Sequence, residues 1–180
     1  VLATQTLVQR RAKTMLVRID GDMCAGVTAK DLILHVIGRI GTGGATGYVI
    51  EYAGSAVTAL DMAGRMTLCN MSIEAGARAG MIAPDEKTFE WLANTPLAPK
   101  GEAFERAKAA WRSLRSDDGA LYDREVMIDA AQVVPMVTWG TSPEAVVAVD
   151  ATIPDPGAIQ DPSKRKQAAE MLAYMGLEQG

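Results

Sequence analysis

The N-terminal third of the sequence alternates stretches that favour strands with stretches that favour helices. KTMLVRID at 13–20 mixes β-branched and apolar residues with polar ones and leads into a Gly-Asp turn, which is typical of a strand. AKDLILHVIGRI follows with apolar residues at helical spacing, between a potential cap at Thr28 and Gly41. A second strand at 47–54 precedes a second helical stretch at 55–60. This order predicts an α/β fold with a short, mostly parallel sheet and right-handed crossovers.

Helical periodicity recurs in the middle of the chain. GRMTLCNMSIEAGARAG predicts a helix over 64–80, built mainly from small and apolar residues. APDEKTFEWLA and KGEAFERAKAAWRSLR predict two more helices, the second over 101–115. We expect the helices at 28–40, 64–80 and 101–115 to pack against the sheet.

The pattern changes from residue 117 onward, and we divide the chain there. Residues 1–116 form the predicted α/β domain segment, and 117–150 a strand-turn-strand extension. Residues 151–180 are predicted to form a proline-rich linker and a terminal helix. We expect 150–162 to be irregular, because its prolines interrupt any hydrogen-bonded ladder.

The composition excludes several classes of function. The formal net charge is −4, from 18 basic and 22 acidic residues mixed along the chain, so no basic surface for nucleic acid or anionic lipid is predicted. The most apolar segment, DLILHVIGRI, contains a histidine and an arginine and is too short to cross a membrane, which needs about 20 apolar residues. The sequence therefore predicts a soluble globular domain without nucleic-acid or membrane partners.

The cysteines and the only histidine do not form a site by sequence spacing. Cys24 and Cys69 lie far apart and outside any CxxC motif, which predicts neither a disulfide framework nor a metal site and favours the reducing cytoplasm. His35 lies on an apolar helix face, where a packed or partly exposed residue is expected rather than a ligand. The chain begins with valine and carries no secretory signal, so we expect a piece of a longer protein.

The glycine-rich stretch GTGGATG at 41–47 is the most conspicuous candidate for a phosphate cradle, because glycines let backbone N–H groups approach an anion. The order of the elements is wrong for a P-loop, since a helix leads into the stretch, a strand follows, and no lysine lies in it. A tightly packed helix-to-strand turn is therefore the favoured interpretation.

Asn70 and Glu74 are the candidate site residues. If 64–80 is one helix, residues four apart project from the same face, so the amide and the carboxylate can converge on one hydroxyl or water. The alternative is structural, because Glu74 and Arg78 have the spacing of an ordinary surface ion pair. Spacing alone favours the surface pair.

A resemblance to a known family changes this balance. Four motifs occur in an order and spacing that resemble the aconitase superfamily, and within it the large-subunit family of bacterial 3-isopropylmalate dehydratase. The motifs are GVTAKDLIL, GTGGATGYVIEYAG, GRMTLCNMSIEAGARAG and APDE. VLATQTL, VTWGTSPEAV, IPDP and AYMGL fit the same family, so the resemblance covers essentially the whole chain. It implies an aconitase-like three-layer α/β/α unit, of which this chain is a part.

The resemblance implies an activity, a cofactor and a partner. The family converts 2-isopropylmalate to 3-isopropylmalate through isopropylmaleate in leucine biosynthesis, using a 4Fe-4S cluster and a separate small subunit. In the CNM-x-x-E motif the Asn and the Glu, here Asn70 and Glu74, face the cluster and its bound hydroxyl or water. Cys69 matches the motif cysteine, which is not a cluster ligand, and Arg78 can orient Glu74. The cluster ligands are expected outside this chain, which is expected to be inactive alone.

Two other classes of function remain open at this point. A related hydro-lyase such as homoaconitase or a maleate-type hydratase would share the 64–80 motif and differ in its substrate pocket. A non-catalytic module that binds anions through the glycine-rich stretch, or that docks a subunit, would bind phosphate or a nucleotide by itself.

Overall fold

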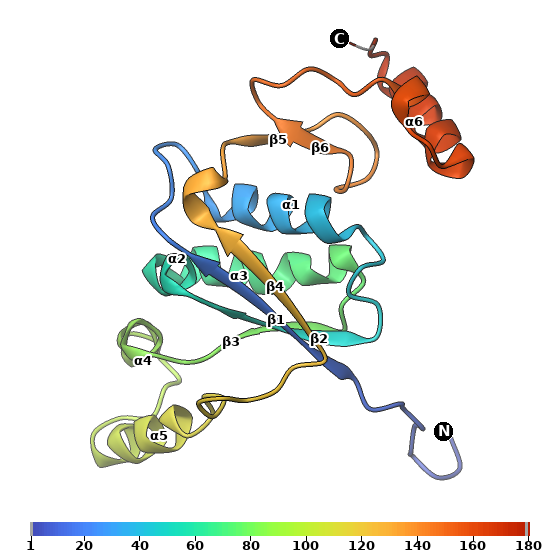
Figure 1. The fold of residues 1–180 in the computed structure, drawn as a ribbon. Helices are drawn as coiled ribbons and strands as arrows, with labels where there is room; N and C mark the ends of the chain where they lie inside the picture. The colour runs from blue at the N-terminus through green and yellow to red at the C-terminus, as the bar shows by residue number, and fades with distance from the viewer. Residues whose placement is uncertain (1, 179) are drawn as a thin grey trace.

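Four parallel strands form the central sheet of the chain, whose computed structural model describes residues 2–178 and 180 (Figure 1). The strands are β1 (Lys13–Asp20), β2 (Tyr48–Ala53), β3 (Ala79–Ile82) and β4 (Arg124–Asp129). Their order across the sheet is β3-β2-β1-β4, so β1 has a neighbour on each side. The predicted α/β fold with a parallel sheet is confirmed.

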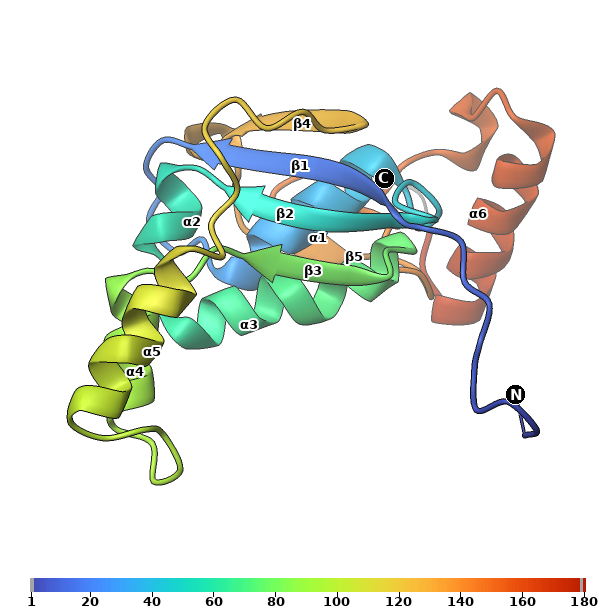
Figure 2. The same ribbon diagram turned by 90° about the horizontal axis from the view of Figure 1, so that it is seen from below.

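One face of this sheet is covered by helices. The connections contain α1 (Ala29–Ile40), α2 (Ser55–Ala59) and α3 (Met62–Met71). α1 and α3 lie side by side and run along the same face of the sheet (Figures 1 and 2). Thr28 occupies the cap position of α1 as predicted. The carboxylate of Asp31, in the first turn, accepts hydrogen bonds from the backbone N–H and the hydroxyl of Thr28.

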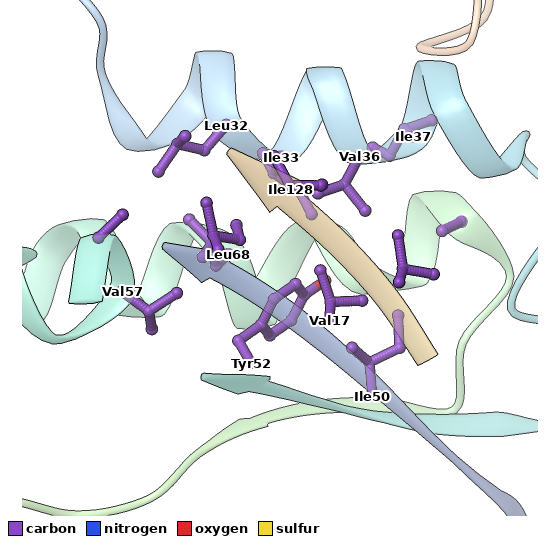
Figure 3. Packing of buried hydrophobic residues seen from close by; sticks show 14 of the residues in the cluster. Val17, Leu32, Ile33, Val36, Ile37, Ile50, Tyr52, Val57, Leu68 and Ile128 are labelled. Carbon is purple, nitrogen blue, oxygen red and sulfur yellow. The ribbon is translucent and has the colours of Figure 1, made fainter. Parts of the chain in front are cut away.

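Alternate strand residues and the inner faces of the two helices form the main core (Figure 3). In β1 every second side chain is buried from Met15 to Ile19, because successive side chains of a strand point to opposite faces. In α1 the buried residues recur at helical spacing. The fully buried aliphatic and methionine side chains include Met15, Val17, Ile19, Ile33, Val36, Ile37, Ile50 and Leu68.

The opposite face of the sheet carries no helix among the described residues. The segment 113–123 passes over it on the way from α5 to β4 (Figure 2). Ser116 and Tyr122 both donate hydrogen bonds to the Glu51 carboxylate on β2, at 2.6 and 3.0 Å. The backbone N–H of Thr14 on β1 donates to the Asp123 carboxylate at 2.8 Å. Side-chain hydrogen bonds therefore hold this segment on the sheet.

The helices α4 (Glu86–Ala93) and α5 (Glu102–Arg112) project away from the sheet (Figure 1). The expectation that the helix at 101–115 packs against the sheet is wrong, because no residue of α5 is buried. α5 instead meets α4 through aromatic rings, with the Trp111 ring centroid 5.9 Å from that of Phe89. The apolar stripe that predicted a covering helix contacts another helix, and periodicity does not distinguish the two cases.

The C-terminal part forms a second, smaller core. β5 (Met136–Thr138) and β6 (Val146–Ala148) pair as an antiparallel hairpin, and α6 (Pro162–Met175) packs near it. The buried residues of this second core are Trp139, Ala145, Ala168, Met171 and Leu172. The predicted irregular segment 150–162 is confirmed as far as residue 161, apart from a short 3₁₀ turn, η3 (Pro156–Ala158), whereas Pro162 is the first residue of α6. The strands predicted within 117–150 are divided between the main sheet and this hairpin, and the three-part division stays a prediction.

Within residues 2–178 and 180, no helix combines the length and the hydropathy that crossing a bilayer requires.

Candidate active site

The predicted helix over 64–80 ends earlier than expected. It begins after Asp61, whose carboxylate accepts a hydrogen bond from the Gly64 N–H, and its α-helical part is α3. A 3₁₀ turn, η1 (Ser72–Ala75), follows, and Gly76 ends it with a left-handed backbone at φ +82°. The last part of the predicted helix is β3, which pairs with β2. The helix prediction is therefore correct for its first half and wrong for its last residues.

This change of structure alters the relation between Asn70 and Glu74. Asn70 lies in the last turn of α3, and Glu74 lies in η1, where each residue advances about 120° rather than about 100° around the axis. The helical spacing that placed both on one face does not continue between them. Both side chains are exposed, and within residues 2–178 and 180 neither makes a side-chain hydrogen bond or an ion pair.

Arg78 lies beyond the end of the turn. Its guanidinium donates to the backbone carbonyl of Arg10 at 2.6 Å, and its N–H donates to the carbonyl of Tyr48. The helical geometry on which the surface pair between Glu74 and Arg78 depends is absent, because Gly76 and the start of β3 intervene. In the described part of the chain, Arg78 fixes the segment before β1 and not the carboxylate.

The turn that carries Glu74 rests on a buried pair of hydroxyl groups. Ser72 is completely buried, and its Oγ lies 2.8 Å from the Tyr52 hydroxyl on β2. The Ser72 hydroxyl also donates to the Leu68 carbonyl at 2.9 Å. Burial raises the pKa of Tyr52 to about 12, so the phenol stays protonated. Sequence reasoning missed this pair, since its members are 20 positions apart and meet only in the folded chain.

The glycine-rich stretch 41–47 supports the same turn from the side. Its Ala45 N–H donates to the Ala75 carbonyl at 2.9 Å. A Cβ added to Gly76 would lie 2.7 Å from Thr46 Oγ1 and 3.0 Å from the Thr42 carbonyl, so only glycine fits there. Thr42 in turn donates its N–H and its hydroxyl to the Glu144 carboxylate.

The same stretch has little capacity left for an anion. Its backbone N–H groups are largely used within the protein. Five N–H groups donate to oxygen atoms of the protein. The bonds run from Gly41 to the Ile37 carbonyl, from Thr42 to the Glu144 carboxylate, from Gly44 to the Gly41 carbonyl, from Ala45 to the Ala75 carbonyl and from Thr46 to the Gly43 carbonyl. The stretch connects α1 to β2, as the interpretation as a helix-to-strand turn predicts.

A pocket of about 510 Å³, the Glu74 pocket, lies beside the carboxylate. It is lined by Met71 and Glu74, by Thr28, Lys30, Asp31 and Leu34 of the α1 region, and by 136–138 and 140–143. Asp31 is nearly buried; burial raises its pKa, but hydrogen bonds from Thr28 and from the Met136 N–H outweigh that effect and lower the pKa. Asp31 is thus an ionised, fully engaged acceptor, whereas the Glu74 carboxylate accepts no such bonds from the described part of the chain.

A larger cavity of about 650 Å³, the strand-end cavity, lies at the carboxyl ends of β1 and β2, where parallel sheets commonly bind ligands. Most of its charged groups are already bonded, although Asp117, which is exposed, has no side-chain partner among the described residues. Arg65 binds both oxygens of Asp85 at 2.6 Å, and Arg18 binds Asp20 at 2.6 Å. Hydrogen bonds from Arg65 lower the pKa of Asp85. We assign the chemistry to the smaller Glu74 pocket, because its unpaired carboxylate, unlike that of Asp117, belongs to the CNM-x-x-E motif and lies on a turn held by buried hydrogen bonds.

The remaining nucleophilic and metal-binding candidates are dispersed. Cys69 is half-buried, and burial raises the pKa of its thiol, which disfavours the thiolate that metals require. Burial and the Arg39 charge lower the pKa of His35. In residues 2–178 and 180 no three His, Cys, Asp or Glu side chains gather as metal ligands. These residues do not fit the cysteine ligation that a 4Fe-4S cluster needs.

One comparison with known proteins covers the whole chain. A family model described as the aconitase family (aconitate hydratase) matches residues 1–180.

Proposed function

The chain belongs to the aconitase family, and we propose that it supplies the Asn70 and Glu74 part of the active site of a 3-isopropylmalate dehydratase. The family comprises hydro-lyases and isomerases of the aconitase type and usually binds a 4Fe-4S cluster. The proposed substrate is 2-isopropylmalate, which is dehydrated to isopropylmaleate and rehydrated to 3-isopropylmalate in leucine biosynthesis. The support for this substrate is the resemblance of GVTAKDLIL, GTGGATGYVIEYAG and GRMTLCNMSIEAGARAG to the large-subunit family.

The observation that carries the proposal is the state of the Glu74 carboxylate. It is exposed beside a pocket, it has no partner in the described part of the chain, and a buried support holds its turn. In the dehydration, protonated Glu74 gives its proton to the departing hydroxyl oxygen, which leaves as water, while a base proposed to lie in another segment of the enzyme removes the proton from the neighbouring carbon and the C–H electron pair forms the double bond. In the rehydration, the Glu74 carboxylate takes a proton from the water whose oxygen adds to the double bond, and the same base outside this chain returns a proton to the other carbon.

Asn70 has a positioning role in this proposal. Its amide offers a donor and an acceptor at the end of α3, one turn before Glu74. We assign it to the substrate hydroxyl or the departing water, which it orients by hydrogen bonding. The roles proposed for both residues concern only the substrate and water, because the described residues do not fit the cluster.

The proposed enzyme is larger than this chain. The cluster ligands and the remaining substrate contacts are proposed to come from other segments of the large subunit and from the small subunit, which is the proposed partner. The complete enzyme is proposed to work in the cytoplasm, and the 180-residue chain alone is proposed to be inactive.

Two experiments test the substrate. The full-length gene with its small-subunit gene should restore growth of a leucine auxotroph that lacks 3-isopropylmalate dehydratase. The purified two-subunit enzyme should hydrate isopropylmaleate with a kcat/KM well above those for homoaconitate and maleate. Failure to complement, together with a preference for either other acid, would replace the proposed substrate and leave family membership in place.

A further inference from the structure

The change from α-helix to 3₁₀ turn takes place at Ser72. In a continuing α-helix its N–H would donate to the carbonyl of Leu68, four residues earlier. Here the Ser72 N–H donates to the backbone carbonyl of Cys69, three residues earlier. The Leu68 carbonyl instead accepts a hydrogen bond from the Ser72 hydroxyl at 2.9 Å. The side chain therefore replaces the backbone bond that the tighter turn gives up, and the Leu68 carbonyl keeps a hydrogen-bond donor.

The direction of that hydroxyl is set from the sheet. Ser72 has one hydroxyl proton, and because it points to Leu68, the 2.8 Å contact with Tyr52 is a bond that the phenol donates. Tyr52 is 1% exposed and reaches from β2 into the core (Figure 3). A Cβ at position 80 would collide with Ser72 Oγ and lie 2.9 Å from Cys69 Cα, so the backbone of Gly80 packs directly against the Ser72 hydroxyl. The Ser72 hydroxyl is therefore held by two hydrogen bonds in a closely packed site.

Glu74 follows two residues later and has no side-chain partner of its own in the described part of the chain. The position of its carboxylate thus depends on the backbone of η1. Two hydrogen bonds hold that backbone. The Ser72 hydroxyl bonds to the Tyr52 hydroxyl on β2, and the Ala75 carbonyl accepts a bond from the Ala45 N–H.

We infer that Tyr52 and Ser72 are positioning residues for Glu74, because their hydrogen bond sets the turn that aims the carboxylate at the substrate. This inference rests on the proposed function, in which Glu74 handles the proton of the hydroxyl. It adds a requirement that the CNM-x-x-E motif does not contain, namely a phenol on β2 that lies outside the motif.

The test uses the complete two-subunit enzyme with Tyr52→Phe and Ser72→Ala, each normalised to its cluster content. Both variants should lower kcat about tenfold while KM stays within about twofold, because a displaced catalytic group slows the reaction more than it weakens binding. The double variant should fall no further than the more affected single variant, since both changes remove the same link. The pH profile of kcat should also shift, since the surroundings of Glu74 change.

A readout independent of turnover is hydrogen exchange of the peptide that covers 72–76. Its amides should exchange faster in Tyr52→Phe and Ser72→Ala than in the parent enzyme. Thr67→Val is the matched control, because Thr67 Oγ1 makes the same kind of bond, to the Ala63 carbonyl at 2.9 Å, earlier in α3. Its kcat, pH profile and exchange at 72–76 should not change. Ile128→Val, in the core part of β4, controls for a general loss of stability.

Two outcomes separate this inference from the proposed function. If Glu74→Gln abolishes turnover while Tyr52→Phe and Ser72→Ala keep full kcat and normal exchange, the positioning role is overturned and the proposed function stands. If Glu74→Gln is fully active, the proposed function fails, and the positioning role fails with it. Equal losses in Thr67→Val or Ile128→Val would also overturn the inference, because a general effect on the fold would explain the data.

Discussion

The Glu74 pocket and the strand-end cavity differ in how their most prominent charged groups are held. In the larger strand-end cavity, Arg65 and Arg18 each bind a carboxylate, and Glu51 accepts two hydroxyl groups. In the smaller pocket, Glu74 carries no partner within the described residues, while the groups beneath its turn are fully bonded. The difference teaches that the size of a cavity is a poor guide to chemistry. Satisfied charges stabilise a fold, and an unsatisfied charge on a rigid support is available for a substrate.

The strongest test of this comparison is Glu74→Gln in the complete two-subunit enzyme. The substitution keeps the shape of the side chain and removes the titratable proton, so turnover should fall by about 10²–10⁴, the range for a lost general acid-base group. Folding and cluster content should stay normal, because the Glu74 side chain makes no hydrogen bond or ion pair within residues 2–178 and 180. Steady-state kinetics and iron analysis measure both, and a fully active variant with an intact cluster would remove Glu74 from the site.

Arg65→Met should have the reverse effect in the strand-end cavity. The Arg65 side chain is 4% exposed and binds Asp85 with two hydrogen bonds, besides the carbonyls of Thr58 and Leu60. Because the Asp85 side chain is 34% exposed, the carboxylate left without its partner is partly solvated, and the protein should be destabilised by about 2 kcal/mol. Urea denaturation measures the loss. The kcat of the protein that remains folded should be unchanged, and a selective loss of kcat would place chemistry in the larger cavity.

A third test uses pH. Hydrogen bonding to Arg65 holds the pKa of Asp85 below its usual value of 3.8, so the folded state favours the ionised form. A group with a lowered folded pKa stabilises the protein above its unfolded pKa, and this contribution is lost as the pH falls below 3.8 through the folded value. Asp85→Asn should therefore reduce the loss of stability in that acid range. An unchanged acid denaturation curve in Asp85→Asn would contradict this account of the pair.

The smallest effect is expected for Arg78→Ala. Its guanidinium binds the Arg10 carbonyl at the surface and not Glu74, so stability should fall by about 0.5 kcal/mol or less and kcat should stay within twofold. Thermal unfolding and kinetics of the variant check this. A fall in kcat comparable to that of Glu74→Gln would show that Arg78 orients the carboxylate in the complete enzyme, and the comparison of free and paired charges would need revision.

The sequence predicted the parts of the fold that depend on local pattern. β1 occupies the predicted residues, and α1 follows its predicted cap, because the strand alternation and the Thr28 cap are readable within a few residues. The predicted helix over 64–80 extended too far because Ala79 and Gly80 fit a packed helix as well as a short strand. Only the pairing of β3 with β2 distinguishes the two.

The candidate site was predictable only in part. Asn70 and Glu74 came from a motif, and their assignment stays a prediction. The hydroxyl pair of Tyr52 and Ser72 was not predictable, since neither residue signals a partner 20 positions away. The contact of the glycine-rich stretch with Ala75 is likewise non-local. The one signal in the sequence is a serine, Ser72, within a largely apolar stretch, because a polar side chain that becomes buried needs a hydrogen-bond partner.

The position of β4 has a consequence for how the chain folds during synthesis. β1 pairs with β4 on one side, and Thr14 and Asp123 at this junction are 109 positions apart. Until residues 124–129 leave the ribosome, β1 is an edge strand with unpaired backbone groups and buried-type side chains at Met15, Val17 and Ile19. Pairing over such a distance is slow. The nascent chain thus passes through a period in which its central strand can pair with another chain, and chaperones that bind apolar strands should act in that interval.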